Sequence, residues 1–173
     1  MKNKYLQLLL VSNVLIILDQ LTKFLVTIHV PIHYSISVIE GFFSITHIRN
    51  PGVAFGLFAR QESEYKVIFF IIVSLIAIIA ILIIFHQSPD DKRAVRIGLI
   101  LIFSGAVGNL IDRILHKEVI DFLDFFYKGS HWPAFNVADS CITIGVSFMI
   151  FDLFYRYPEV ADTPRVSNKS LKD

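Results

Sequence analysis

The chain has 173 residues, of which 54% are hydrophobic, and its formal net charge is +1. Soluble domains contain about 45–50% apolar residues, so this excess, with a mean hydropathy of +0.62, excludes an ordinary soluble domain. The near-neutral charge indicates no nucleic-acid partner, and a single cysteine, Cys141, excludes an internal disulfide framework and a multi-cysteine metal site.

The first predicted element is a membrane-spanning helix over 5–28. Lys2 and Lys4 precede it, as they would precede a cleaved secretory signal. However, the segment is long, contains Asp19 and Lys23, and is not followed by a small-residue cleavage site. We therefore expect a permanent helix.

The region 29–66 is expected to lie outside the membrane. Ser35–Ile48 mixes β-branched and aromatic residues with turn formers, and Asn50-Pro51-Gly52 is a strong turn. This pattern predicts a small β element on the outer membrane surface, followed by a short amphipathic helix over about 53–65.

Three further spanning helices are predicted over 67–86, 95–115 and 136–155. Val67–Phe85 contains no charge and is long enough to cross about 30 Å of hydrocarbon as a helix. The expected fold class is thus an all-α membrane protein with four transmembrane helices in a single domain, 1–157. The polar residues 158–173 are expected to form a disordered cytoplasmic tail.

The placement of lysine and arginine predicts the orientation. One side of the membrane receives the N-terminus, the 87–96 loop and the tail, which carry Lys2, Lys4, Lys92, Arg93, Arg96, Arg156, Arg165, Lys169 and Lys172. The opposite loops are much longer but hold fewer basic residues. Both termini are therefore expected in the cytoplasm.

Polar residues from three predicted helices and one loop fall at the same depth, close to the outer interface. Each ionisable group in hydrocarbon costs several kcal/mol and needs a reason. The residues concerned are Asp19, Lys23, Asn109, Asp112, Arg113, Asp121, Asn136 and Asp139. Independent structural ion pairs would have no reason to agree in depth, so the pattern indicates a site.

Small residues line the same level. Gly105, Gly108 and Ala138 allow close helix packing, and they also predict a groove that is wide enough for acyl chains.

Carboxylates are the chemistry that remains once other motifs are excluded. The chain has no His-Glu-x-x-His, its six histidines are scattered, and Cys141 has no nearby histidine and is expected to be a packing residue. Two neighbouring aspartates in a low-dielectric site share one proton and activate water without metal or cofactor. The candidates are Asp19, Asp112, Asp121, Asp124 and Asp139.

Neighbouring cations separate these candidates. Lys23 favours a structural, ionised Asp19, and Arg113 does the same for Asp112. Asp121 and Asp139 have no obvious cationic partner and lie among apolar residues, which favours them as the pair.

Five segments resemble the lipoprotein (type II) signal peptidases of the bacterial inner membrane. In chain order they are Asp19-Gln20-Leu21-Thr22-Lys23, Arg49-Asn50-Pro51-Gly52-Val53-Ala54-Phe55-Gly56, Gly105-Ala106-Val107-Gly108-Asn109-Leu110-Ile111-Asp112-Arg113, Val119-Ile120-Asp121-Phe122 and Phe135-Asn136-Val137-Ala138-Asp139-Ser140. One departure is Ser104, where the family often has a glycine.

The resemblance implies an aspartyl endopeptidase that cleaves diacylglyceryl-modified prolipoproteins before the lipidated cysteine, with Asp121 and Asp139 as catalytic dyad. It implies a β cradle over the site, a lid helix, and no cofactor or metal. Supporting or substrate-contacting positions would be Asp19, Lys23, Asn50, Gly105, Gly108, Asn109, Asp112, Arg113, Asn136 and Ala138. We expect a monomer that meets its prolipoprotein substrate within the membrane lipid.

Two other hypotheses fit the sequence less well. A small multi-pass transporter or proton carrier would space ionisable residues through the full membrane thickness, whereas Val67–Phe85 has none. A non-enzymatic scaffold leaves Asp139 unexplained.

Overall fold

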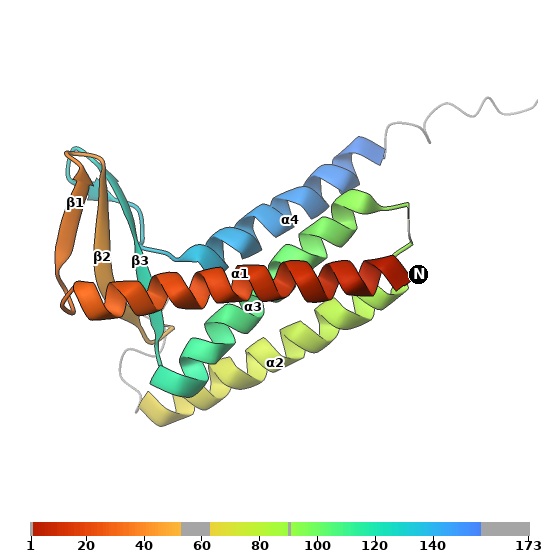
Figure 1. Ribbon diagram of the computed structural model, residues 1–173, viewed down its shortest axis with the longest axis horizontal. Helices are drawn as coiled ribbons and strands as arrows, with labels where there is room; N and C mark the ends of the chain where they lie inside the picture. Colours follow the sequence, from red (N-terminus) through yellow and green to blue (C-terminus); the bar gives the residue numbers. More distant parts are fainter. Residues whose placement is uncertain (1, 53–62, 90, 157–173) are drawn as a thin grey trace, which may run out of the picture.

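The computed structural model describes residues 2–52, 63–89 and 91–156, and it places a small sheet at one end of a helix bundle (Figure 1). The elements in chain order are α1 (Lys2–His29), β1 (Ser35–Ile39), β2 (Phe43–Asn50), α2 (Ser63–Gln87), α3 (Arg93–His116), β3 (Val119–Tyr127), β4 (Ser130–His131) and α4 (Val137–Arg156).

The four helices are each long and apolar enough to cross a membrane, as the sequence predicted. Their outward faces carry large apolar side chains, such as Ile76 (61% exposed) and Phe151 (59% exposed), which suit contact with lipid. The four-helix membrane fold is thereby confirmed. Several ends differ from the expected ones: α2 begins at Ser63 rather than at 67, and α4 begins at Val137 rather than at 136.

The central helix is α3, which packs against α1, α2 and α4. Glycine makes the α3–α4 contact very close. A Cβ atom added at Gly98 would lie 2.7 Å from the Gly145 carbonyl oxygen, and one at Gly145 would lie 2.6 Å from the Gly98 oxygen. The two backbones therefore touch, which is the use of small residues expected between membrane helices.

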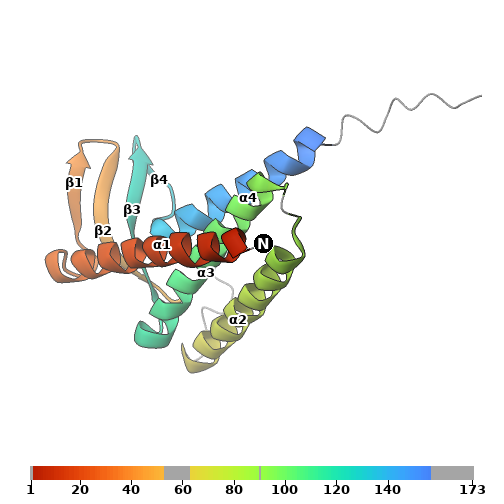
Figure 2. The ribbon, with the colours of Figure 1, turned by 45° about the vertical axis from the view of Figure 1, so that its right-hand side comes forward.

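The sheet is antiparallel with strand order β1-β2-β3-β4, and all four strands lie at one end of the bundle (Figure 2). Strands β1 and β2 form at the predicted β region Ser35–Ile48, and β2 continues two residues beyond it to Asn50. Strands β3 and β4 were not predicted. In β3 the acidic residues Asp121 and Asp124 are three apart, so the segment lacks the two-residue alternation typical of a half-buried strand. Pairing with the distant β2 makes it a strand.

An apolar cluster joins the sheet to α1. Val26 and Val30 of α1 pack with Phe122 of β3, and Ile45 of β2 packs against them. This contact places β3, and with it Asp121, against the end of the bundle.

The predicted amphipathic helix over 53–65 falls mainly outside the described residues, and residues 63–65 belong to α2. The predicted tail 158–173 also lies outside the described residues.

Candidate active site

The start of α4 positions the first carboxylate. Asn136 immediately precedes the helix, and its Oδ1 accepts a hydrogen bond from the Asp139 backbone N–H at 2.9 Å. In return, the Asn136 backbone N–H donates to Oδ2 of Asp139 at 3.3 Å. This reciprocal pair has the form of a capping box. It holds Asp139 in the first turn, where the helix dipole stabilises negative charge.

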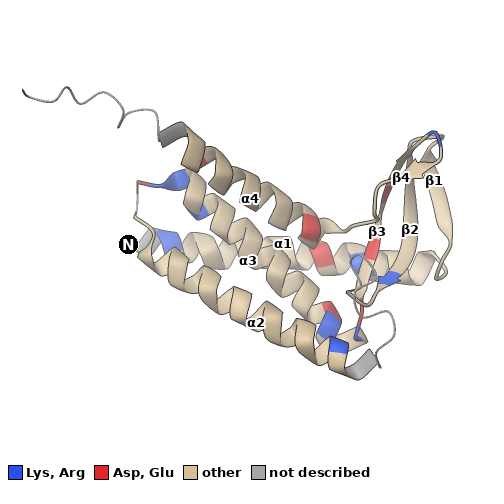
Figure 3. Cartoon of the chain, turned by 180° about the vertical axis from the view of Figure 1, so that it is seen from behind, with Lys and Arg blue, Asp and Glu red and all other residues tan. Residues whose placement is uncertain are grey.

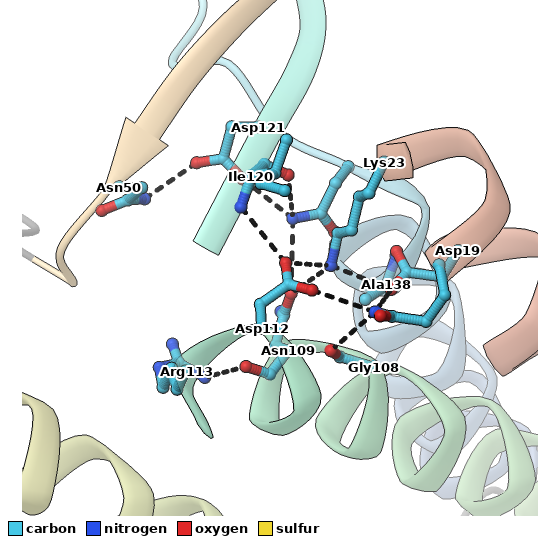
Figure 4. A network of polar contacts seen from close by, with 12 residues as sticks. Asp19, Lys23, Asn50, Gly108, Asn109, Asp112, Arg113, Ile120, Asp121 and Ala138 are labelled. Atoms are coloured by element: carbon cyan, nitrogen blue, oxygen red, sulfur yellow. Dashed lines mark hydrogen bonds and ion pairs between the residues drawn. The ribbon is translucent and has the colours of Figure 1, made fainter. Parts of the chain in front are cut away.

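The second carboxylate belongs to β3. Oδ1 of Asp121 accepts from Nδ2 of Asn136 at 2.8 Å, and Oδ2 accepts from Nδ2 of Asn50 at 2.9 Å (Figure 4). Asn136 therefore touches both Asp121 and Asp139. The strand that the sequence did not predict is what brings Asp121 to the end of α4.

Asn109 of α3 completes the set of amide donors, because its Nδ2 donates to Oδ1 of Asp139 at 2.7 Å. Each of the three asparagines has its side-chain oxygen held by a donor. These donors are the Gly52 N–H for Asn50 (2.9 Å), Lys23 Nζ for Asn109 (3.1 Å) and the Asp139 N–H for Asn136 (2.9 Å). Since the oxygen end of each amide is occupied in this way, the NH₂ end must face a carboxylate.

A buried charge cluster lies beside the two carboxylates. Nζ of Lys23 is 2.8 Å from Oδ2 of Asp19 and 2.8 Å from Oδ2 of Asp112, and all three residues are 1% exposed (Figure 4). Gln20 donates to both acids, at 3.1 Å and 3.0 Å. The prediction that Lys23 would pair with Asp19 is confirmed, and the lysine serves a second acid as well.

The same two acids tie the elements of the site together. Asp19 accepts from the Ala138 backbone N–H at 2.9 Å, which fixes the start of α4 to α1. Asp112 accepts from the Ile120 N–H at 3.2 Å, which fixes β3 to α3. Ala138, which precedes Asp139, is thereby held to α1, and Ile120, which precedes Asp121, is held to α3.

Arg113 is not the ion-pair partner that the sequence suggested for Asp112, because Lys23 takes that place. The Arg113 guanidinium instead lies over the Phe70 ring of α2, 5.6 Å from its centroid. Its Nη1 donates to the Asn109 carbonyl oxygen at 3.3 Å and to Ser74 Oγ at 3.4 Å. Adjacent residues on a helix point in different directions, which separates Arg113 from Asp112.

The expected groove at the small residues is also absent from this part of the structure. A Cβ at Gly105 would meet the Ala138 carbonyl oxygen, and one at Gly108 would lie 2.6 Å from Oδ2 of Asp19. Ala138 is fully buried. These residues let α1, α3 and α4 approach one another, so the space assigned to acyl chains is filled by protein.

Burial raises the pKa of the Asp121 carboxyl from its ordinary value of 3.8 to about 6. Hydrogen bonds from Asn50 and Asn136 and the charge of Lys23 act in the opposite direction, whereas the charge of Asp139 adds to the rise. A carboxyl with such a pKa can carry a proton near neutral pH and release it.

The structure brings together every predicted site residue except Asp124, which was only a candidate acid. Asp124 instead pairs with Nδ1 of His131 at 2.9 Å on the far part of the sheet. Four contributing residues were missed: Gln20, Gly52, Phe70 and Ser74. Only Gln20 and Gly52 lie in the motif segments, and nothing in the apolar sequence of α2 marks Phe70 or Ser74.

Cys141 is buried, as expected of a packing residue. Within the described ranges no group of three or more His, Cys, Asp or Glu side chains is arranged to hold a metal ion.

Comparisons with known proteins agree with the motif segments. Residues 11–155 match the family model described as signal peptidase (SPase) II. The lipoprotein signal peptidase of Desulforapulum autotrophicum is 50% identical over 155 residues, covering 89% of this chain and 96% of the relative. That of Geobacter metallireducens is 48% identical over 153 residues, covering 88% and 93%.

The fold has a solved counterpart as well. A bacterial membrane enzyme determined by the in meso method at 2.3 Å resolution superposes with a TM-score of 0.76 and 35% identity, covering 96% of this chain and 94% of that one. The match in sequence over most of both chains, and in fold, shows that this multi-pass membrane protein belongs to the signal peptidase II family.

Proposed function

We propose that this chain is an aspartic endopeptidase that removes signal peptides from diacylglyceryl-modified prolipoproteins, cutting before the lipidated cysteine. The name of its relatives, lipoprotein signal peptidase, supports the substrate class. The arrangement of Asp121 and Asp139 around Asn136 supports the mechanism.

The proposal rests mainly on the hydrogen bonds that Asn136 makes to both carboxylates. Asn136 donates from Nδ2 to Asp121 and from its backbone N–H to Asp139, so both carboxylates face one small polar region. In the reaction, the ionised aspartate takes a proton from water, and the resulting oxygen nucleophile attacks the scissile carbonyl carbon. The protonated aspartate donates its proton to the carbonyl oxygen. The aspartate that took the proton from water then donates it to the leaving nitrogen as the C–N bond breaks, and the other aspartate takes back its proton from the oxygen as the carboxylic acid product forms.

The two carboxylates differ in surroundings, which assigns their roles. Asp139 lies in the first turn of α4, where the helix dipole favours the anion, and we assign it as the base. Asp121 has a pKa of about 6 because of its burial, and we assign it as the proton carrier.

The remaining residues support this pair. We propose that Asp19, Lys23, Asp112, Gly105, Gly108 and Ala138 hold the helices and β3 together. We assign Asn109 and Asn136 as donors that orient the carboxylates. Asn50 and Arg113, which are half-buried, are proposed to contact substrate as well. The reaction needs no metal or cofactor, and a monomer contains all of these groups.

The mechanism is tested by Asp121→Asn and Asp139→Asn, compared with Asp124→Asn as a matched control. An amide neither ionises nor cycles protons, so each of the first two variants should lose about 100-fold or more in turnover of a lipidated precursor. Asp124→Asn should cleave like the parent. Substantial activity in either dyad variant, with thermal melting confirming a folded protein, would overturn the mechanism.

The substrate class is tested with one precursor in lipidated and unlipidated form. Each methylene of the acyl chains that remains buried contributes about 0.8 kcal/mol, so the lipidated form should be cleaved far faster, chiefly through a lower KM. Equal cleavage of the two forms would refute the lipid requirement and leave the dyad assignment standing.

A further inference from the structure

Helix α2 looks purely apolar in sequence, yet it meets the site through the ring of Phe70. This ring lies against Gly52 of the Asn50-Pro51-Gly52 turn: a Cβ atom added at Gly52 would lie only 2.5 Å from Cε2 and 2.7 Å from Cδ2 of the ring. The Arg113 guanidinium also packs on the ring, 5.6 Å from the centroid. Phe70 therefore touches both a loop and a charged residue of the candidate site.

Two hydrogen bonds connect Gly52, which contacts the Phe70 ring, to the carboxylate of Asp121 through Asn50. Gly52 has a φ of 84°, a left-handed conformation that favours glycine. In that conformation its N–H donates to Oδ1 of Asn50 at 2.9 Å, and Nδ2 of Asn50 is thereby directed to Oδ2 of Asp121 at 2.9 Å. A shift of Gly52 would turn or withdraw the amide that faces Asp121.

Arg113, the second residue that contacts the Phe70 ring, is hydrogen-bonded to Asn109 of the site. Ser74, one turn along α2 from Phe70, accepts from Nη1 of Arg113 at 3.4 Å, and the same Nη1 donates to the Asn109 carbonyl oxygen at 3.3 Å. The guanidinium interacts electrostatically with Asp139, Asp112 and Asp121. Phe70 and Ser74 thus hold a cation near both members of the dyad.

We propose that Phe70 is a positioning residue for peptide hydrolysis, whose ring supports Gly52 so that Asn50 donates to Asp121 and at the same time supports the Arg113 guanidinium beside the dyad. The inference rests on the proposed function of Asp121. It gives α2 a part in the reaction through packing, because no contact described for residues 65–87 reaches Asp121 or Asp139 directly.

The pKa of Asp121 distinguishes a positioning role of Phe70 from a role in packing alone. The charged groups that act on Asp121 are Asp139 of α4, Lys23 of α1 and Arg113 of α3. The Asn50 hydrogen bond stabilises the ionised form, so losing it raises the pKa of the Asp121 carboxyl further. A packing defect elsewhere would lower the amount of folded enzyme without moving a pH profile.

The first test compares Gly52→Ala with Gly129→Ala. Gly129 has a similar φ of 80°, but nothing lies within 4 Å of a Cβ atom added there, so the two variants share backbone strain and differ in the contact with Phe70. Gly52→Ala should move the alkaline limb of the profile of kcat/KM against pH upward by about 1 unit, the effect of one lost hydrogen bond to a charged group. Gly129→Ala should leave the limb in place. Identical profiles for the two variants would overturn the proposal.

The second test changes the ring itself and compares Phe70→Leu with Phe69→Leu. Phe69 is the neighbouring aromatic of α2, is 49% exposed, and packs edge to face on the Phe70 ring with 5.4 Å between centroids. Both variants therefore lose this ring pair, and only Phe70→Leu also loses the ring that contacts Gly52 and Arg113. Phe70→Leu should lower kcat by about 10- to 100-fold through misplacement of the reacting groups, with a smaller change in KM and the same upward shift of the alkaline limb. Phe70→Tyr, which keeps the ring, should restore the parent behaviour.

Equal kcat and equal profiles for Phe70→Leu and Phe69→Leu would refute the positioning role. The Asp121→Asn variant separates this failure from failure of the proposed function. If Asp121→Asn is inactive while Phe70→Leu behaves like Phe69→Leu, the dyad assignment holds and only the role of Phe70 is wrong.

Discussion

At the scale of single residues, the two groups of acids in this site differ in what neutralises them. Asp19 and Asp112 face a full positive charge, the ammonium of Lys23, which makes them a buried structural cluster. Asp121 and Asp139 accept hydrogen bonds from uncharged amides. Amide donors orient a carboxylate without binding it permanently in the ionised form, which is what a group that exchanges protons requires.

Asp121 should therefore reduce the stability of the protein when it ionises. Its folded-state pKa of about 6 exceeds the ordinary 3.8, so its stabilising contribution is complete below the ordinary value and is lost as the pH rises through about 6. Asp121→Asn cannot ionise. The stability of this variant relative to the parent should increase between about pH 4 and pH 7, by up to on the order of 3 kcal/mol.

Thermal melting in detergent at several pH values measures this difference, with Asp124→Asn as control. A relative stability that is constant with pH, or that falls as pH rises, would contradict the raised pKa of Asp121.

Removing the charge of Lys23 should instead lower the stability of the protein. Lys23→Met leaves two buried acids without their cation, and breaking a buried ion pair in this way costs about 3–5 kcal/mol. Lys128→Met is the matched control, since Lys128 is exposed at the tip of the sheet. A melting temperature of Lys23→Met close to that of the control would show that the cluster does not hold the bundle together.

At the scale of elements, the position of α4 depends on two contacts of different kinds. Near its start, Asp19 accepts from the Ala138 N–H, and Gly105 lets the backbone of Ala138 approach α3. Further along, Gly98 and Gly145 bring the two helix backbones together. The first contact lies beside Asp139 and the second lies towards the opposite end of the bundle.

Substitutions at the two contacts should both lower stability, but only the one beside Asp139 should also lower activity. Gly105→Ala and Gly98→Ala each insert a methyl group into a filled contact and should each cost about 1–3 kcal/mol. Only Gly105→Ala displaces the start of α4, so it should also lower kcat of the folded enzyme. Melting and cleavage assays on both variants decide the point, and an equal loss of kcat would mean that α4 moves as one rigid rod.

At the scale of the whole molecule, the sheet and the site share one end of the bundle, and the basic residues near the N-terminus and at the start of α3 lie at the other end (Figure 3). An excess of lysine and arginine is typical of the cytoplasmic side. We therefore propose that both termini are cytoplasmic and that the sheet faces outward, where a lipidated precursor presents its cleavage point.

Cysteine labelling tests this orientation. In a Cys141→Ala background, a cysteine in place of Lys128, at the sheet end, should react with an impermeant maleimide added to the outside of intact cells. A cysteine in place of Gln87, at the end of α2, should react only after the membrane is opened. The reverse pattern would invert the topology and place the dyad on the wrong side for its substrate.

Elements and residues whose signals are local could be predicted before the fold was known. Four spans follow from apolar length alone, and Asp19, Lys23, Asn109, Asp121, Asn136 and Asp139 follow from the cost of polar groups at one depth. Strands β1 and β2 follow from composition next to a strong turn.

Contacts between distant segments depend on the folded arrangement and could not be predicted locally. β3 is a strand because β2 pairs with it, and Lys23 rather than Arg113 neutralises Asp112 because side-chain direction, not sequence adjacency, sets the partner. The small residues that suggested a groove are packed against protein. No local pattern marks Phe70, because whether an aromatic residue in an apolar helix contacts lipid or the Asn50-Pro51-Gly52 turn depends on which neighbour covers that face.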